Sequence, residues 1–233
     1  MDIELVRELV ALNLTFYRDF AQSFSDSRAK FETGYAHLLG FIPAGKPTVL
    51  DVGCGNGRFG RFLQENIVLG QYTGVDFSPF FLGKMGESGH RVLQRDLSLP
   101  GCLDDLGSFD LIVCLATMQH IPGGSNRQRL LEEMANHLRP DGRIVVSNWQ
   151  FLTNPRQQHK ILPWESVGID PSRLESHDFL LSWGRGGSGS RYVAYLDREA
   201  MNEAATSAGL RVVNQFRADG REGDLNLYTI LAS

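Results

Sequence analysis

The sequence predicts an α/β fold in which helices cover both faces of a mostly parallel sheet. Short apolar segments alternate five times with amphipathic segments between about residues 49 and 147, which is typical of parallel strands joined by helices. The last two apolar segments are separated only by residues 218–223. We therefore expect them to pair as an antiparallel hairpin at one end of the sheet.

The first strand is expected at residues 49–52, and a glycine-rich turn follows it. Gly53, Gly55 and Gly57 alternate with other residues just before an amphipathic segment. Glycines leave such a turn without side chains, so a ligand can lie against the backbone. The helix start that follows offers free N–H groups and a positive dipole end. Asp51 beside this turn favours a cationic ligand over a phosphate.

The remaining elements follow from periodicity and from residues that begin or end helices. Residues 2–40 are expected to be helical, with a second helix from about Ser27 to Leu39. Later helices are predicted after Ser78-Pro79, through Leu130–Leu138, and from Asp197 to Gly209. The further strands are expected at residues 71–76, 91–94, 109–114, 143–147, 211–217 and 224–232.

The alternation breaks at about residue 148. Residues 149–191 contain three prolines, isolated aromatic residues and the glycine-rich run 184–190. This composition indicates an insertion on the substrate side with a mobile tip. We expect a single domain, 1–233, with an N-terminal helical segment, 1–42, and this insertion at about 149–191.

Bulk composition excludes several classes of protein. The formal net charge of −4 gives no broad attraction to nucleic acid or to anionic membranes, although a local basic patch stays open. The three cysteines lack metal-ligand spacing and cannot all pair, so we expect no metal site and reduced thiols in a cytoplasmic protein. No apolar run approaches the roughly 20 residues that span a bilayer, so no membrane partner is expected.

Three acidic residues end successive strands: Asp51, Asp76 and Asp96. In an open parallel sheet, ligands bind beyond the carboxyl ends of the strands. Asp76 follows Gly57 by 19 residues, a spacing at which a carboxylate can accept hydrogen bonds from ribose hydroxyls. A single such acid is more often a helix cap or a turn residue. Three of them after a glycine turn favour a nucleoside site.

These residues resemble class I S-adenosylmethionine-dependent methyltransferases. The similarity lies in five segments: Val49–Phe59, Gly74–Ser78, Arg95–Leu97, Phe109–Ile121 and Leu138–Arg143. It implies a Rossmann-like, seven-stranded, mostly parallel sheet with an antiparallel C-terminal strand. It also implies S-adenosylmethionine as cofactor and S-adenosylhomocysteine as product. Asp141 stands where the family usually has glycine, which should affect only a turn.

The resemblance also assigns cofactor contacts. It places the methionine end of the cofactor on the glycine turn and near Asp51, the ribose on Asp76, the adenine on Phe77 and Asp96, and the methyl group near Leu115. Cys54 is expected to be a small turn residue, since no paired base accompanies it. The full expected cofactor set is Asp51, Gly53, Cys54, Gly55, Asn56, Gly57, Asp76, Phe77, Ser78, Asp96, Leu97, Leu115 and Ala116.

The candidate residues on the acceptor side are His120, Gln119 and Arg28. His120 follows the fourth strand, where a general base would face the acceptor; the alternative is a structural loop histidine. Gln119 could instead orient the acceptor. Arg28 belongs to a narrower resemblance, to the tRNA wobble-uridine carboxymethyl methyltransferases, carried by these segments: Phe16–Ala21, Phe24–Arg28, Asp178–Trp183, Arg191–Tyr195 and Ala208–Val213.

This narrower resemblance implies methylation of a carboxylate, which is already ionised and needs no base. Arg28 would then face the cofactor carboxylate or the substrate acid, unless it is a solvated helix residue. Two features depart from that family. Ser27 replaces a threonine, and Gln119-His120 replaces a histidine pair. Cations and acids are also nearly balanced in the insertion, whereas a tRNA site needs clustered cations.

Four functions therefore stay open. The favoured one is methyl transfer to an oxygen or nitrogen of a small molecule or modified nucleoside, with a carboxylate as the specific case. The second is modification of the wobble uridine of tRNA. The third is non-catalytic binding of the cofactor. The fourth is a nicotinamide oxidoreductase, because residues 55–60 fit G-x-G-x-x-G; Asp51 would repel its pyrophosphate.

Overall fold

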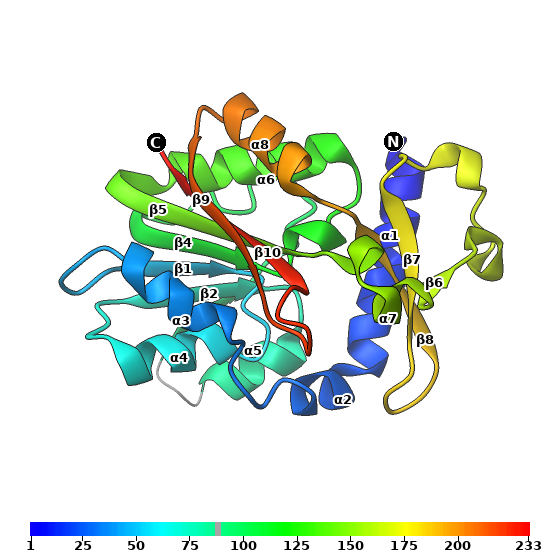
Figure 1. Cartoon of the computed structure of the whole chain (residues 1–233), viewed down its shortest axis with the longest axis horizontal. Coiled ribbons are helices and arrows are strands. Elements are labelled where there is room, and N and C mark those ends of the chain that lie inside the picture. The colour runs from blue at the N-terminus through cyan, green and yellow to red at the C-terminus, as the bar shows by residue number, and fades with distance from the viewer. Residues whose placement is uncertain (87–89) are drawn as a thin grey trace.

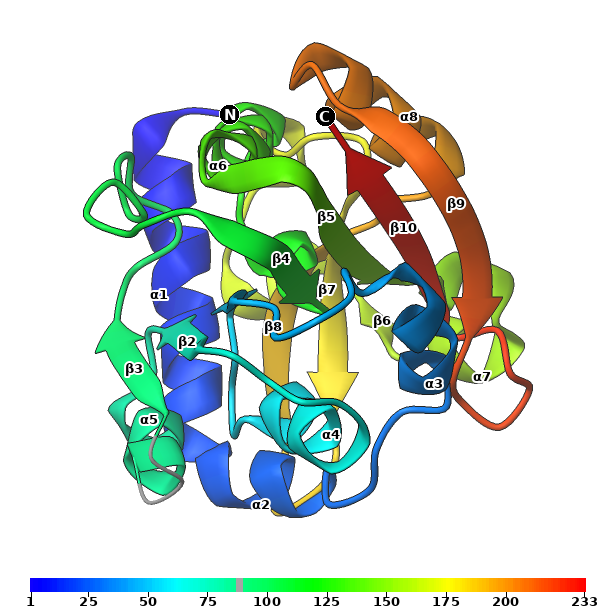
Figure 2. The ribbon, with the colours of Figure 1, turned by 90° about the vertical axis from the view of Figure 1, so that its left-hand side faces the viewer.

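A computed structural model describes residues 1–86 and 90–233. Within this part of the chain, seven strands form one sheet in the order β3-β2-β1-β4-β5-β10-β9 (Figures 1 and 2). Strands β1 to β5 pair in parallel, and β10 runs antiparallel to both β5 and β9. The predicted fold class is confirmed. The strands are β1 (Val49–Val52), β2 (Tyr72–Asp76), β3 (Arg91–Gln94), β4 (Phe109–Leu115), β5 (Leu138–Trp149), β9 (Arg211–Ala218) and β10 (Asn226–Ala232).

Helices cover both faces of this sheet, because successive strand side chains point to opposite sides. Leu50 and Ile112 belong to the apolar cluster that contains residues of α6 and α8. Val49 and Leu111 belong to the cluster that contains residues of α3 and α4. The helices around the sheet are α3 (Gly34–Leu38), η1 (Leu39–Phe41), α4 (Arg58–Asn66), α5 (Pro79–Gly86), η2 (Met118–His120), α6 (Gly124–Asn136) and α8 (Arg198–Ser207).

The N-terminal segment forms two consecutive helices, α1 (Ile3–Asp19) and α2 (Ala21–Asp26). The predicted helix from Ser27 to Leu39 is wrong, since only its last part is helical. The C-terminal hairpin determines where α3 begins, because Asp219 accepts a hydrogen bond from the Gly34 N–H at 2.7 Å. A Cβ on Gly34 would lie 2.5 Å from the ring of Tyr228. Long-range contacts therefore decide where α3 begins.

Three other helix ends test the sequence predictions. Asp197 caps α8 and accepts a hydrogen bond from the Ala200 N–H at 3.0 Å, and Gly209 beyond the helix has φ +69°; both predictions are confirmed. Leu138 does not end α6 as predicted but pairs with Phe109 in the sheet. The register then shifts, and the predicted turn at residues 140–142 becomes an irregular part of β5.

The segment 149–191 contributes strands to a second, antiparallel sheet of order β6-β7-β8. Figure 1 shows this small sheet beside α1, beyond one end of the main sheet. The run 184–190 lies at the turn between β7 and β8. The elements here are η3 (Phe151–Thr153), α7 (Pro155–Gln158), β6 (Ile161–Leu162), η4 (Trp164–Val167), η5 (Pro171–Arg173), β7 (Asp178–Trp183) and β8 (Gly189–Ala194).

Asn13 joins α1 to the small sheet and to the loop after β4. Its side-chain oxygen accepts from the Tyr192 N–H at 2.8 Å, and its amide donates to the carbonyls of Tyr192 and His120. The helix α1 and strand β8 are therefore fixed together over one end of the main sheet. Among the described residues, no helix has the length and apolar character that crossing a membrane requires.

Candidate active site

A cavity lies where β1, β2 and β4 end, beneath α1 and α2. It encloses about 1100 Å³ of space free of protein atoms, including its open mouth. Residues far apart in the sequence meet there. Thirteen of the predicted site residues line it: Arg28, Asp51, Gly53, Cys54, Gly55, Asn56, Asp76, Phe77, Asp96, Leu97, Leu115, Ala116 and His120.

The glycine turn is fastened to β2 and leaves its backbone open to the cavity. The N–H groups of Gly53 and Cys54 donate to the carbonyl of Val75 at 2.8 and 3.0 Å. Gly53 has φ +79°, and a Cβ there would lie 2.2 Å from the Thr117 hydroxyl oxygen. Gly55 has φ +52°, and a Cβ there would meet no atom within 4 Å. The first glycine permits close packing, and the second leaves open space that a ligand can fill.

The Asp76 carboxylate is held in place at the end of β2. Its two oxygens accept hydrogen bonds from the N–H groups of Gly55 and Ser78, each at 2.9 Å. Each carboxylate oxygen keeps a further lone pair for a ligand hydroxyl. Burial raises the pKa of Asp76 to about 6. Ser78 does not line the cavity and instead helps to fix Asp76.

Asp51 is the most enclosed acid of the cavity, with 2% of its surface exposed. The Tyr72 hydroxyl donates a hydrogen bond to its Oδ2. Burial raises the pKa of Asp51 to about 7, against the opposing effect of the Tyr72 hydrogen bond. A cationic group in the cavity would stabilise the ionised form and lower this pKa.

The other predicted cofactor residues are placed by short local contacts. One oxygen of Asp96 accepts from the N–H and hydroxyl of Ser98. Ala116 has φ +52°, and its N–H donates to the Ser147 carbonyl at 2.9 Å. Gly57 lies outside the cavity lining, where its φ of +73° begins α4. A non-glycine residue with positive φ is a strained position of the kind that occurs at ligand sites. The sequence prediction included Ala116 but not its positive φ.

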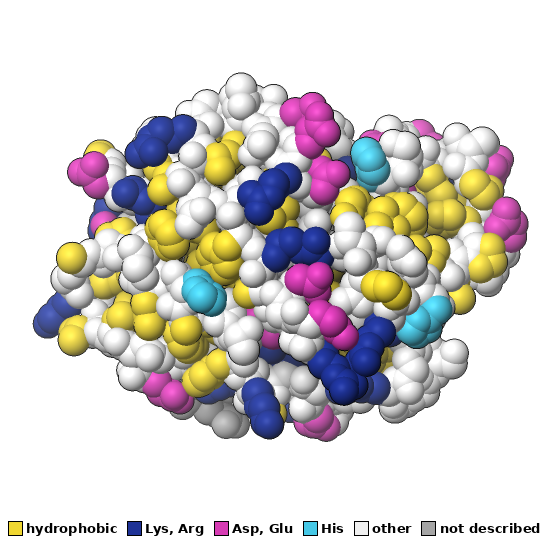
Figure 3. All heavy atoms as spheres, viewed as in Figure 1, with side chains coloured by type: hydrophobic (Ala, Val, Ile, Leu, Met, Phe, Trp, Pro, Cys, Tyr) yellow, Lys and Arg dark blue, Asp and Glu magenta, His cyan; other side chains and the backbone are white. Residues whose placement is uncertain are grey.

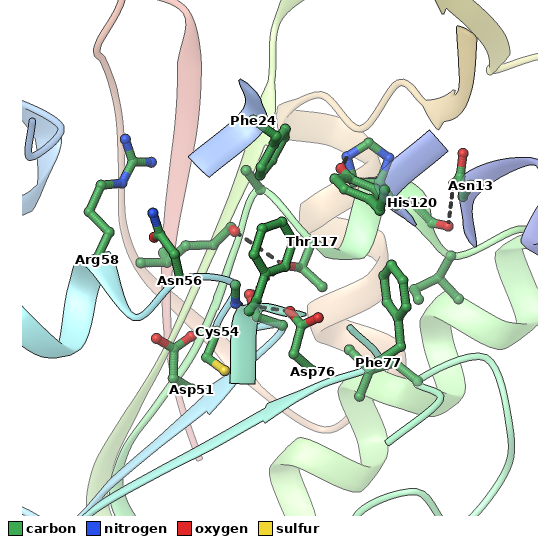
Figure 4. Close-up of a pocket in the computed structure, with 18 of the residues that line it drawn as sticks. Asn13, Phe24, Asp51, Cys54, Asn56, Arg58, Asp76, Phe77, Thr117 and His120 are labelled. Carbon is green, nitrogen blue, oxygen red and sulfur yellow. Dashed lines mark hydrogen bonds between the residues drawn. The ribbon is translucent and has the colours of Figure 1, made fainter. Parts of the chain in front are cut away.

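The His120 imidazole, labelled in Figure 4, has a hydrogen-bond partner at each ring nitrogen. Its Nδ1 is 3.0 Å from the Tyr192 carbonyl, and its Nε2 is 3.0 Å from the Tyr17 hydroxyl. Because a carbonyl only accepts, Nδ1 carries the proton and Nε2 accepts from Tyr17. Burial, and then the positive charge of Arg191, lowers the pKa of His120 to about 3. The ring is therefore neutral, and its basic nitrogen is already occupied.

Gln119 does not line the cavity. Its side chain is fully buried, and its oxygen accepts a hydrogen bond from the Trp149 N–H at 2.7 Å. This contact joins the loop after β4 to the end of β5. We therefore assign Gln119 a structural role in place of the predicted contact with the acceptor.

Arg28 lines the cavity and is not a solvated helix residue. Its guanidinium lies 3.3 Å from the centre of the Phe24 ring and donates to the Ser27 hydroxyl at 2.9 Å. Burial, and then the charge of Arg191, lowers its pKa to about 9. The amide of Asn56 in the glycine turn donates to the hydroxyl of Ser25 in α2 at 3.2 Å, so α2 and the turn form one wall.

Comparison with known proteins agrees with this geometry. Residues 50–144 match a family of methyltransferase domains. A solved structure of an S-adenosylmethionine-dependent methyltransferase from Clostridium acetobutylicum superimposes with a TM-score of 0.65 at 14% identity, covering 92% of this chain and 98% of that one. Residues 50–144 form a methyltransferase domain, and the chain has the fold of the class I S-adenosylmethionine-dependent methyltransferases. The corresponding sequence prediction is confirmed, and the nicotinamide alternative is wrong.

Two relatives of this methyltransferase are informative. A protein of Encephalitozoon cuniculi whose name assigns it to the methyltransferases is 26% identical, over 85% of this chain and 87% of its own length. The tRNA (carboxymethyluridine(34)-5-O)-methyltransferase of Arabidopsis thaliana is 27% identical over 57% of this chain. The match spans only 31% of the Arabidopsis protein, so much of that protein lies outside the comparison.

The cavity also involves residues to which the sequence had assigned no role. Tyr17, Asn13 and Thr117 line the site, and Arg191 acts on it through its charge. Tyr17 and Arg191 fall within the segments that resemble the wobble-uridine enzymes, which was the one available signal. Thr117 lies within the segment Phe109–Ile121, but that resemblance assigned it no role, and Asn13 has no signal because its partners lie on distant segments.

Proposed function

We propose that this methyltransferase transfers a methyl group to an oxygen or nitrogen of a small molecule or modified nucleoside, and that the favoured acceptor is a carboxylate. The cavity between the glycine turn and the small sheet would hold both reactants. The segment 149–191 would form the acceptor-side wall of a single catalytic domain. The similarity to an enzyme named for carboxymethyluridine supports this choice of acceptor.

The residues of the cavity fit S-adenosylmethionine. When bound, the cofactor supplies a methyl group on a positively charged sulfur. Gly55 leaves room against the turn, Asp51 would face the cofactor ammonium, and Asp76 would accept from the ribose hydroxyls. The adenine would lie near these side chains: Phe77, Asp96 and Leu97. Arg28 follows α2 and lines the cavity, so we assign it to the cofactor carboxylate.

The lowered pKa and the hydrogen bonds of His120 support a carboxylate as the acceptor. A neutral hydroxyl or amine must lose a proton during methylation, and a positioned base speeds that loss. The Nε2 of His120 already accepts from Tyr17, and the ring is a weak base because its pKa is lowered to about 3 by burial and by Arg191. A carboxylate needs no such help and only has to be held in line. His120 would therefore position Tyr17 rather than remove a proton.

Modification of tRNA is the second candidate, supported by the similarity to the Arabidopsis enzyme. A tRNA site needs clustered, unpaired cations. On the face seen in Figure 3, acidic side chains lie among the basic ones. Arg156 and Arg217 form ion pairs with Glu222 and Asp224 at 3.2 and 3.6 Å. These observations favour a smaller acceptor.

The proposal is tested by methyl transfer from labelled S-adenosylmethionine into separate pools of small molecules, nucleosides and tRNA. We expect label in the small-molecule or nucleoside pool, and loss of most of it for Asp51→Asn. Label confined to tRNA, with retention on tRNA that weakens steeply as salt is added, would establish the second candidate. Cofactor binding without transfer to any pool would contradict both and indicate a non-catalytic binding protein.

A further inference from the structure

Among the described residues, Arg191 on β8 is a buried cation without an acidic partner, and its one side-chain polar interaction is with the Tyr17 hydroxyl. Its exposed fraction is 6%, and neither its Nε nor its Nη1 has a hydrogen-bond partner. No salt bridge to it occurs among residues 1–86 and 90–233. Buried arginines are normally paired with carboxylates, because removing a charge from water costs several kcal/mol. The position of Arg191 therefore needs an explanation.

Three aromatic rings surround the Arg191 guanidinium. Its carbon lies 4.5 Å from the ring centre of Trp149, 4.8 Å from Phe16 and 5.3 Å from Trp183. Ring faces attract a cation but accept its N–H hydrogen bonds only weakly. The rings therefore hold the group in place while leaving at least three of its five N–H donors unused, one on Nε and two on Nη1.

The charge of Arg191 acts on the acceptor side of the cavity. Burial raises the pKa of Tyr17, and the Arg191 charge opposes that rise. The same charge contributes to the lowered pKa values of His120 and Arg28. No carboxylate is among the groups that act on Arg191. Arg28 and Tyr17 line the cavity, and Arg191 lies behind Tyr17 and acts on both of them.

We propose that Arg191 binds the acceptor by pairing with its carboxylate, so that the substrate itself supplies the missing anion. This inference rests on the proposed function and extends it to a specificity-determining residue. Arg28 and Arg191 would then serve two different anions, the cofactor carboxylate and the acceptor carboxylate.

The transfer balances without a proton. One carboxylate oxygen forms a bond to the methyl carbon, the carbon–sulfur bond breaks, and its electron pair stays on sulfur. A carboxylate and a sulfonium become a neutral ester and a neutral thioether. The ester can no longer pair with Arg191, which favours its release. Methylation of a neutral hydroxyl or amine would instead release one proton per turnover.

The test compares Arg191→Met with wild type, with Arg191→Lys as the charge-retaining variant. Arg185→Met is the matched control, because it removes an exposed arginine from the same hairpin. Methyl transfer from labelled S-adenosylmethionine into extracted small-molecule, nucleoside and tRNA pools is followed by mild base, which releases label from methyl esters as methanol. Melting temperature and calorimetric affinity for S-adenosylhomocysteine are measured for all four proteins.

We expect base-labile label from wild type and Arg185→Met. For Arg191→Met the rate at low acceptor concentration should fall about 10- to 150-fold, the range for hydrogen bonds to a charged group, and Arg191→Lys should recover part of it. Cofactor affinity should change less than twofold. The melting temperature of Arg191→Met should be unchanged or higher, since the variant no longer buries an unpaired charge.

Three results would overturn the inference. One is base-stable label, which shows an ether or N-methyl product and leaves the methyltransferase function standing. Another is unchanged transfer by Arg191→Met. The third is loss of transfer by Arg191→Met together with a clear drop in melting temperature, which assigns Arg191 a structural role. Cofactor binding without any label would instead remove the proposed function on which the inference rests.

Discussion

Substitution of Asp76 by asparagine is the sharpest test of the cofactor assignment. The two carboxylate oxygens accept from two backbone N–H groups, Gly55 and Ser78, each at 2.9 Å. An amide has a single acceptor oxygen, so its NH₂ must face one of these donors. The variant therefore loses one backbone contact and one acceptor for the ribose. Together these losses cost about 2–3 kcal/mol, or about 30- to 150-fold in Kd.

Calorimetry with S-adenosylhomocysteine measures this loss directly. Asp141→Asn is the control, because Asp141 is exposed and its φ of +63° suits asparagine equally well. The fold should survive in Asp76→Asn, since burial already raises the pKa of Asp76 to about 6 and a neutral amide carries no charge to desolvate. A cofactor Kd within twofold of wild type, in a folded variant, would refute the assignment of Asp76 to the ribose.

Three further predictions concern the same cavity. Burial raises the pKa values of Asp51 and Asp76 to about 7 and about 6, and the cofactor should favour both ionised forms. Affinity should therefore rise from pH 5 to pH 8 with proton release near pH 6.5, seen by calorimetry in two buffers; a flat profile would contradict this. Tyr17→Phe removes the donor to His120 at 3.0 Å and should lower turnover about 10-fold with unchanged cofactor affinity; unchanged turnover would exclude a role. Gly53→Ala places a Cβ 2.2 Å from Thr117 at φ +79° and should lower the free energy of unfolding in urea by about 2 kcal/mol or more, whereas Gly40→Ala, with open space around it, should not.

The parallel sheet could be predicted because each of its strands leaves a signal in a short stretch of the sequence. A buried strand reads as an apolar run, and each acid at a strand end marks the same edge of the sheet. Asp51, Asp76 and Asp96 therefore reached one cavity as predicted. The glycine turn was equally readable, because the positive φ of Gly53 and Gly55 is a conformation that glycine adopts without strain.

The side-chain contacts on the acceptor side of the cavity could not be predicted from such local patterns. Whether Gln119 faces the cavity depends on the Trp149 N–H, 30 positions away. The start of α3 depends on Asp219, 185 positions from Gly34. The lack of an acidic partner for Arg191 among the described residues is a property of the packed molecule, and the sequence around Arg191 does not predict it. Tertiary contacts override local propensity at such positions.

The three hydrogen bonds of Asn13 have a consequence for how new acceptor preferences can arise. The Asn13 amide connects α1, the loop that carries His120 and strand β8, so these three parts keep their relative positions when other side chains are substituted. Substitutions on the inner side of the β7–β8 hairpin can therefore change the shape of the acceptor side of the cavity without moving the cofactor. Loss of the Asn13 amide would instead allow all three parts to move relative to one another, and selectivity among all acceptors would fall together.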